Sequence, residues 1–296
     1  MKTEKKMSRR KFIETTATTL AAVTVASSFV GFRPLSTKGK AGSLKFIHVT
    51  DSHLDLGKPQ TIKWLEMMVK KVNADYPSID FVLFGGDNFN NNAPGFDDAN
   101  TFKKIADKLK CPWYAVRGNK ESNPKPEGDP LNQKDFAKMF FPSDVKVVGR
   151  DWKLDKGRYT ILGIDTTIEK QNNGVYTPET LAFVEKELKE NPDRSFIILN
   201  HQVYSNFWKG TKEGDLHKYV LNNVKEVKKR LFGYPNLLLT LSGHKHLNNV
   251  AKSKSVTEVA TLGFVVPQDQ NNKDDHRFRY IEINDNKITQ KIVSIV

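Results

Sequence analysis

The stretch Phe81-Val82-Leu83-Phe84-Gly85-Gly86-Asp87-Asn88 joins a short apolar run to two glycines and an acid. An aromatic and β-branched run of this length predicts a strand that is buried on both faces. The glycines allow a sharp turn and a close approach to the backbone. Asp87 should therefore lie just beyond the carboxyl end of the strand, the edge at which open α/β sheets bind ligands. We predict that Asp87 is a functional carboxylate.

The segments around this strand alternate between strand and helix patterns. Residues 44–51, 81–87 and 112–116 are apolar runs of strand length, whereas residues 59–73 and 97–109 place apolar side chains at helical spacing. Strands that alternate with helices in this way predict βαβ units and a parallel sheet. This pattern predicts the α/β class.

The second half of the chain continues with further strands and helices. Residues 145–154 predict one strand, residues 177–190 a helix, and residues 215–232 one long helix with an apolar face. Residues 249–296 are rich in strand patterns. No internal repeat or low-complexity linker interrupts residues 42–296, which predicts one domain.

Charge and cysteine content restrict the classes of function. The 296 residues carry a net charge of +13, but nine Lys/Arg and two Glu place +7 of it in residues 1–41. The remaining +6 makes the body mildly basic, which suits an anionic substrate without requiring nucleic acid. Cys111 is the single cysteine, so an intramolecular disulfide is excluded.

The first 41 residues have the features of an export signal. Ser8-Arg9-Arg10-Lys11-Phe12 resembles the bacterial twin-arginine motif, and a weakly apolar segment rich in Ala, Thr and Ser follows over residues 13–30. Its polar content makes it a poor membrane anchor. We expect residues 1–41 to be a signal peptide and linker, the twin-arginine machinery to be a partner, and the protein to be periplasmic or secreted without a stable membrane anchor. A membrane anchor and an unstructured tail are the alternatives.

Metal-ligating residue types follow five of the predicted strands. They are Asp51 and His53, Asp87, Asn119, His201, and His244 and His246. Strand ends in one sheet lie side by side, so these residues can converge although 195 positions separate the first from the last. A mixed imidazole, carboxylate and amide set suits Mn, Fe or Zn. One ion can take Asp51, His53, Asp87 and His246, and a second can take Asp87, Asn119, His201 and His244.

The order Asp-x-His, Gly-Asp, Gly-Asn, His and Gly-His-x-His resembles the calcineurin-like metallophosphoesterase superfamily over residues 44–249. This resemblance implies a four-layer αββα sandwich, in which helices flank two mixed β-sheets, and a dinuclear centre bridged by Asp87. It also implies a metal-dependent phosphoric ester hydrolase with two divalent transition-metal ions, Mn, Fe or Zn. The substrate would be a small phosphate mono- or diester, attacked by a metal-bound hydroxide.

The third motif departs from the family pattern. The usual Gly-Asn-His is here Gly118-Asn119-Lys120, followed by Glu121. We expect Asp87, Asn119 and Lys120 to be catalytic residues. A lysine can stabilise phosphoryl oxygens, but it is a poor proton donor near neutral pH, which puts protonation of the leaving group in question.

Two other functions fit parts of the sequence. A nuclease-type phosphodiesterase would need a continuous basic groove with interleaved aromatic residues. The basic residues between 209 and 230 are more simply the solvated face of a helix, so we expect no nucleic-acid partner. A metal-binding scaffold that has lost turnover through Lys120 is the other alternative. Tyr204, Phe207 and Trp208 follow His201 and either stack on a substrate or pack a loop onto the body.

Overall fold

A computed structural model describes residues 42–265 and 275–296 of the chain, all within one compact unit. The predicted signal peptide and linker, residues 1–41, lie outside the described residues. No helix in the described part of the chain combines the length and the apolar character that crossing a membrane requires.

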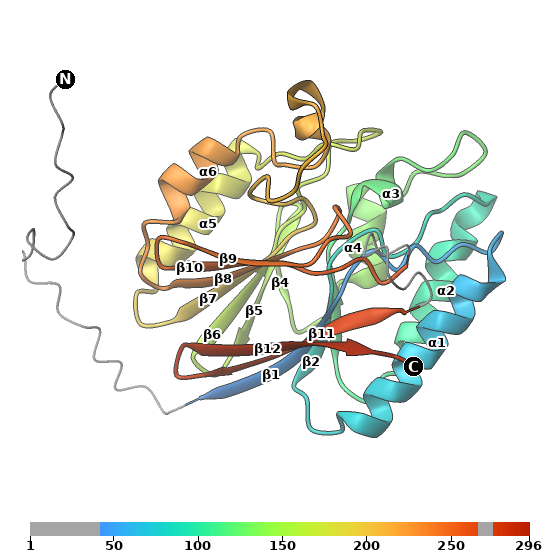
Figure 1. The fold of residues 1–296 in the computed structure, drawn as a ribbon, viewed down its shortest axis with the longest axis horizontal. Coiled ribbons are helices and arrows are strands. Elements are labelled where there is room, and N and C mark those ends of the chain that lie inside the picture. Colours follow the sequence, from blue (N-terminus) through green and yellow to red (C-terminus); the bar gives the residue numbers. More distant parts are fainter. Residues whose placement is uncertain (1–41, 266–274) are drawn as a thin grey trace, which may run out of the picture. The chain divides into compact units, whose positions relative to one another are not determined.

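Two mixed β-sheets form the middle of this unit (Figure 1). The first sheet has the order β12-β11-β1-β2-β3, with β1 (Ser43–Val49), β2 (Phe81–Phe84), β3 (Trp113–Ala115), β11 (Arg277–Asn284) and β12 (Lys287–Ser294). The second has the order β4-β5-β6-β7-β8-β10-β9, with β4 (Lys146–Val148), β5 (Asp151–Lys156), β6 (Tyr159–Gly163), β7 (Ser195–Leu199), β8 (Leu237–Ser242), β9 (Asn249–Ser253) and β10 (Val256–Ala260). Strands β1, β2 and β3 run parallel to one another, as do β6, β7, β8 and β10.

Helices cover the outer face of each sheet (Figure 1). The helices are α1 (Pro59–Asp75), α2 (Asp97–Ala106), α3 (Asn119–Ser122), α4 (Gln133–Phe140), α5 (Pro178–Glu190) and α6 (Val224–Leu231), with 3₁₀ turns at Pro94–Phe96 and Glu213–Lys218. Apolar side chains of α1, α2 and α4 share a cluster with the first sheet, and those of α5 and α6 share one with the second. The predicted αββα sandwich is confirmed.

A third apolar cluster lies between the two sheets and holds them together. Trp152 of β5 is 1% exposed, and its indole N–H donates to the Ala115 carbonyl of β3 at 3.0 Å. This bond joins a strand of one sheet to a strand of the other, and it satisfies an indole donor that burial would otherwise leave unpaired. The apolar contacts and this hydrogen bond set how closely the strand ends of the two sheets approach.

Three boundaries differ from the sequence prediction. The predicted helix 215–232 is wrong, because Val220 forms a β-bridge with Val203 and separates the turn Glu213–Lys218 from α6. The predicted strand 145–154 is two strands, β4 and β5, which pair antiparallel around Gly149 at φ +61°. The helix predicted over 97–109 ends at Ala106. In the first two cases a pairing that residue spacing does not encode overrides the local pattern.

The turns after β2 and β3 are fastened to one buried carboxyl group, that of Glu121. Its oxygens accept the backbone N–H of Asp87 at 3.1 Å, of Asn88 at 2.6 Å and of Gly118 at 2.9 Å. Three donors on one side chain fix the two turns against each other. Glu121 therefore positions the predicted site residues on both.

We expect replacement of Glu121 to destabilise the metal-free protein in proportion to the acceptors lost. At pH 9 the carboxyl group is ionised, although burial and the nearby Asp87 charge raise its pKa to about 8. Glu121→Met leaves three N–H groups unsatisfied, each costing about 1–3 kcal/mol, and Glu121→Gln retains one acceptor. The free energy of unfolding in urea should be highest for the wild type, lower for Glu121→Gln and lowest for Glu121→Met. The exposed Glu127→Gln should match the wild type. Equal stability of the wild type and the Met variant would contradict this role.

Candidate metal centre

The structure brings the seven predicted ligand residues to one place, the carboxyl ends of five strands. Asp51 and His53 follow β1, Asp87 follows β2, Asn119 follows β3, His201 follows β7, and His244 and His246 follow β8. The carboxylate and imidazole atoms form two groups, within each of which they lie within 4.8 Å of one another: Asp51, His53 and His246, and Asp87, His201 and His244. Each group draws residues from both sheets, so neither exists unless the sheets are packed together.

Asp87 lies between the two groups. Its Oδ2 is 3.8 Å from His53 Nε2, and its Oδ1 is 3.3 Å from His201 Nε2. The backbone N–H of Lys120 donates to Oδ1 at 2.7 Å and helps to fix the carboxylate. One oxygen therefore faces each group, an arrangement that allows the carboxylate to be shared by two ions.

Asn119 lies beside the second group. Its Oδ1 is 3.2 Å from His201 Nε2, and its Nδ2 donates to Asn172 Oδ1 at 3.2 Å. The bond to Asn172 occupies the amide nitrogen, so the carbonyl oxygen is the atom directed at the group. An oxygen in that position is the donor atom that an asparagine ligand offers.

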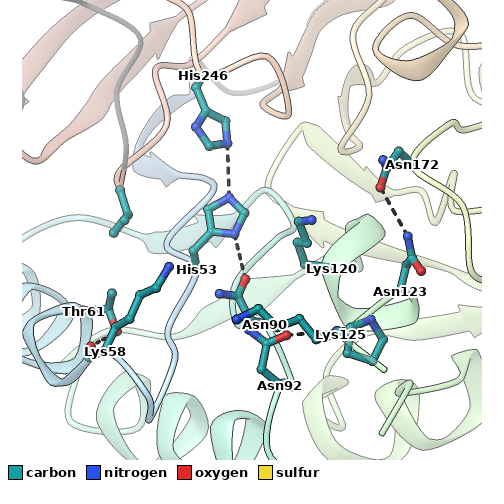
Figure 2. A pocket seen from close by; sticks show the side chains of 12 residues that line it. His53, Lys58, Thr61, Asn90, Asn92, Lys120, Asn123, Lys125, Asn172 and His246 are labelled. Carbon is teal, nitrogen blue, oxygen red and sulfur yellow. Dashed lines mark hydrogen bonds between the residues drawn. The ribbon is translucent and has the colours of Figure 1, made fainter. Parts of the chain in front are cut away.

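Three of the four histidines donate a hydrogen bond from the ring nitrogen that points away from the groups. His201 Nδ1 donates to the Gly85 carbonyl at 2.8 Å, and His244 Nε2 donates to the Lys218 carbonyl at 2.5 Å. His53 Nδ1 donates to Asn90 Oδ1 at 2.9 Å (Figure 2). Each bond sets the tautomer and leaves the other nitrogen as a lone-pair donor, as metal-binding histidines require.

Asp51 and the two histidines of its group also fit a cation. Asp51 Oδ2 accepts from Thr50 Oγ1 and from the backbone N–H of His244, whereas its buried Oδ1 receives no hydrogen bond. His53 Nε2 and His246 Nε2 lie 3.1 Å apart, and His246 Nε2 is 3.1 Å from Asp51 Oδ1. Ring nitrogens and a carboxylate oxygen converging on one point form a suitable donor set for a transition metal.

The charges of the site favour ionised carboxylates. Burial opposes ionisation of Asp51 and Asp87, but the neighbouring imidazoles offset it and lower the pKa of both carboxyl groups well below the ordinary range. Burial also opposes protonation of His201, but the Asp87 carboxylate beside it raises its pKa to about 10. Burial, together with the charge of His201, lowers the pKa of His244 to about 4. The carboxylates are therefore in the form that binds metals, whereas His201 would have to release its proton when an ion binds.

Five of the seven residues adopt a backbone conformation that residues other than glycine rarely occupy. The φ angles are +56° at Asp51, +42° at His53, +50° at Asp87, +63° at His244 and +57° at His246. Non-glycine residues in this region cluster at functional sites, where the surrounding structure holds the strain. The unfavourable φ angles after these strands direct the ligand side chains toward the two groups, and they cost conformational energy at each residue.

Two glycines permit the close approach of these turns. A Cβ on Gly118 would lie 2.2 Å from the Asp87 nitrogen, and a Cβ on Gly243 would lie 1.9 Å from Thr50 Oγ1. Neither position can accept a side chain without displacing a neighbouring turn.

A cavity of about 490 Å³ opens beside the first group (Figure 2). His53, His246 and Lys120 line it, together with Lys58, Thr61, Asn90, Asn92, Asn123, Pro124, Lys125, Asn172 and Val265. Lys120 thus meets both the cavity, through its side chain, and Asp87, through its backbone. The segment after the third motif thus forms part of the cavity wall through Asn123, Pro124 and Lys125.

The aromatic residues after His201 pack the loop onto the body. Tyr204 is 3% exposed, and its hydroxyl bonds that of Tyr176 at 2.5 Å. Trp208 stacks edge-on against Tyr219. None of the three predicted aromatic residues is among those that line the cavity in the described part of the chain.

Sequence reasoning missed several of the supporting contacts. Asn90 accepts a hydrogen bond from His53, and the buried Asp55 accepts one from Asn90 Nδ2 at 3.1 Å. Asp55 therefore helps to position His53 through Asn90. Gly85 and Lys218 contribute backbone carbonyls, which no residue type reveals. Asn172 has no strand before it and no motif around it. Two of these residues did have a signal, since Glu121 directly follows the third motif and Asp55 lies two residues after His53.

Comparison with known proteins agrees with this geometry. Residues 44–248 match the family of calcineurin-like phosphoesterases. A probable glycerophosphodiester phosphodiesterase GpdQ of Arcobacter nitrofigilis is 25% identical over 212 residues, which cover 68% of this chain and 71% of that protein.

Solved structures share the fold. A dimetal phosphatase from Danio rerio superposes with a TM-score of 0.62 at 11% identity, over 86% of this chain and 99% of that one. The purple acid phosphatase PPD1 of yellow lupin has a TM-score of 0.54 at 14% identity, over 87% of this chain and 52% of that one. With the family match spanning most of its length, this chain is a member of the calcineurin-like phosphoesterase family.

Proposed function

We propose that this protein is an exported phosphoesterase that hydrolyses small phosphate mono- or diesters with two divalent transition-metal ions, Mn, Fe or Zn. Asp51, His53, Asp87 and His246 would hold one ion, and Asp87, Asn119, His201 and His244 the other. The observation that carries the proposal is the placement of Asp87, with one carboxylate oxygen toward each group. The family membership and the similarity to a probable phosphodiesterase support the reaction class.

Some residues would hold the metal ions, and Lys120 would stabilise the negative charge of the phosphoryl group. When bound, two divalent ions supply Lewis acidity and a water of lowered pKa to the phosphoester. Asn119 and the four histidines hold their positions through second hydrogen bonds or close packing, so the site is preorganised. Lys120, on the cavity wall next to Asp87, would stabilise charge on phosphoryl oxygens without having to transfer a proton.

We expect about two transition-metal ions per chain in protein produced with Mn, Fe and Zn available. His244→Ala should lower the metal content toward one and reduce phosphoesterase activity at least about a hundredfold, because losing a ligand disturbs the position of the ion and the charge of the site. His217→Ala, an exposed histidine, is the matched control and should retain both. Elemental analysis and a chromogenic aryl phosphate measure the two quantities. A metal-free wild type would contradict the proposal.

We expect Lys120→Ala to lose about a hundredfold in rate on aryl phosphates with good leaving groups, the usual effect of removing one oxyanion donor. Lys120→His should extend activity toward poor leaving groups, since imidazole can protonate them near neutral pH. A series of aryl phosphates with rising leaving-group pKa, run on both variants and on the exposed Lys134→Ala, measures this. If Lys120→Ala matched the wild type throughout, Lys120 would be a bystander.

The same assays separate the competing functions. A metal-loaded protein that hydrolyses neither a phosphomonoester nor a phosphodiester would be the scaffold, whereas a preference for polynucleotides would indicate the nuclease. The similarity to a probable glycerophosphodiester phosphodiesterase makes a glycerophosphodiester the diester to test first.

Export rests on the sequence of the leader. We expect replacement of Arg9 and Arg10 by lysine to keep the precursor in the cytoplasm, because the paired arginines are the recognised element of twin-arginine signals. Replacement of Lys5 and Lys6 by arginine, which leaves the pair intact, should not change export. Cell fractionation and immunoblotting report the outcome, and full export of the Arg9/Arg10 variant would contradict the route.

A further inference from the structure

The cavity beside the metal centre carries positive charge beyond what one phosphoryl group needs. Lys58, Lys120 and Lys125 all line it, and no Asp or Glu is among its lining residues in the described part of the chain. None of the three ammonium groups forms an ion pair with a described carboxylate. Figure 2 shows Lys58 and Lys120 approaching from opposite sides of His53, with Lys125 beside Asn90 and Asn92. Lys120 and Lys125 come from one segment, and Lys58 comes from the segment before α1, so the fold brings two distant parts of the chain together here.

The floor of the cavity is rigid. Asn90 and Asn92 both donate to Asp55 Oδ2, at 3.1 and 3.0 Å, and Asn92 Oδ1 accepts the backbone N–H of Lys125 at 3.0 Å. The charge of Lys58 acts on the Asp55 carboxylate, but the hydrogen bonds of that carboxylate are made to these amides and to the Gly57 N–H at 2.9 Å. The hydrogen bonds of Asp55, Asn90 and Asn92 thus fix the backbone at Lys125. The Asp55 carboxylate is not itself among the residues that line the cavity.

Apart from the imidazoles of His53 and His246, which belong to the first ligand group, the described residues of the lining contain no aromatic ring, and most of them are polar. Side-chain amides and one hydroxyl predominate, and Pro124 and Val265 are the apolar members of the lining. Stacking platforms for a nucleobase are built from aromatic side chains, so this wall does not provide one. A volume of about 490 Å³ nevertheless falls within the range of sites that enclose a whole small ligand.

We propose that the substrate is a small, non-aromatic phosphoester that carries a second anionic group, a phosphate or a carboxylate, and that Lys58 and Lys125 bind this second group. The inference rests on the proposed function, because it places the scissile phosphate at the two groups of ligands, next to Lys120. Lys120 and the two ions would face that phosphate. Lys58 and Lys125 then face the rest of the substrate, where a second anion would form charge-assisted hydrogen bonds.

Equilibrium binding tests the inference independently of turnover. Isothermal titration calorimetry of the full-length protein, freed of metal by a chelator, would compare glycerol 3-phosphate with 3-phosphoglycerate, whose second group is a carboxylate, and with glycerol 1,3-bisphosphate, whose second group is a phosphate. We expect at least one of the two doubly anionic ligands to bind about tenfold more tightly than glycerol 3-phosphate, a step of about 1.4 kcal/mol that one or two charged hydrogen bonds supply. The carboxylate and the bisphosphate arms identify which anion the lysines prefer. AMP should show no comparable gain.

The variants assign this preference to the two lysines. Lys58→Gln/Lys125→Gln should reduce the ratio of affinities to below about threefold. Lys186→Gln/Lys189→Gln removes the same charge from exposed positions on α5 and should keep the ratio. In the metal-loaded protein, the ratio of the KM for glycerol 3-phosphate to the KM for a doubly anionic substrate should fall in the Lys58/Lys125 variant and stay unchanged in the Lys186/Lys189 variant.

Three results would overturn the inference: no preference in the wild type, an equal loss in the α5 variant, or tighter binding of AMP than of both doubly anionic ligands. Absence of hydrolysis in the metal-loaded protein would refute the proposed function instead, and the binding data would remain interpretable.

Discussion

The arrangement of this protein depends on burying two carboxylates, Asp51 and Asp87, where the two sheets meet. Each is at most 2% exposed, and removing an ionised carboxylate from water costs several kcal/mol unless positive charge or hydrogen bonds compensate. Thr50 and the His244 amide satisfy one oxygen of Asp51, and the Lys120 amide satisfies one oxygen of Asp87. The other oxygens face imidazoles, and cations between these groups would balance the remaining charge.

Holding those carboxylates in place accounts for the strained backbone around them. An extended strand points successive side chains to opposite faces of the sheet, whereas the left-handed residues after β1, β2 and β8 turn theirs toward a common point. Strain of this kind persists only where the surroundings over-determine it. The core between the sheets, the Trp152 bond to Ala115 and the carboxyl group of Glu121 supply that constraint. The stable parts of the fold thus support a locally unfavourable site.

Sequence patterns predicted the fold class and the residues that converge, because both depend on short-range features. An apolar run followed by Gly-Asp or Gly-His is visible in the sequence, and the parallel order of strands places such ends together. The break at Val220 and the pairing of β4 with β5 depend on partners, one of them as distant as Val203, that local spacing does not encode. Support from the Gly85 and Lys218 carbonyls was also invisible, since every residue carries a carbonyl group.

The two sides of the metal centre are built differently, and this difference indicates from which side a substrate would enter. On the side of His244, the Lys245 ammonium lies 4.2 Å from the ring centre of Tyr219 and 4.9 Å from that of Trp208, so aromatic packing stiffens the turn between the last two histidines. On the side of His53 and His246, the polar cavity opens with its lysines. A phosphoester would therefore enter from the side of the lysines, which attract its negative charge. The histidines that it reaches there are fixed in position by the aromatic packing on the opposite side.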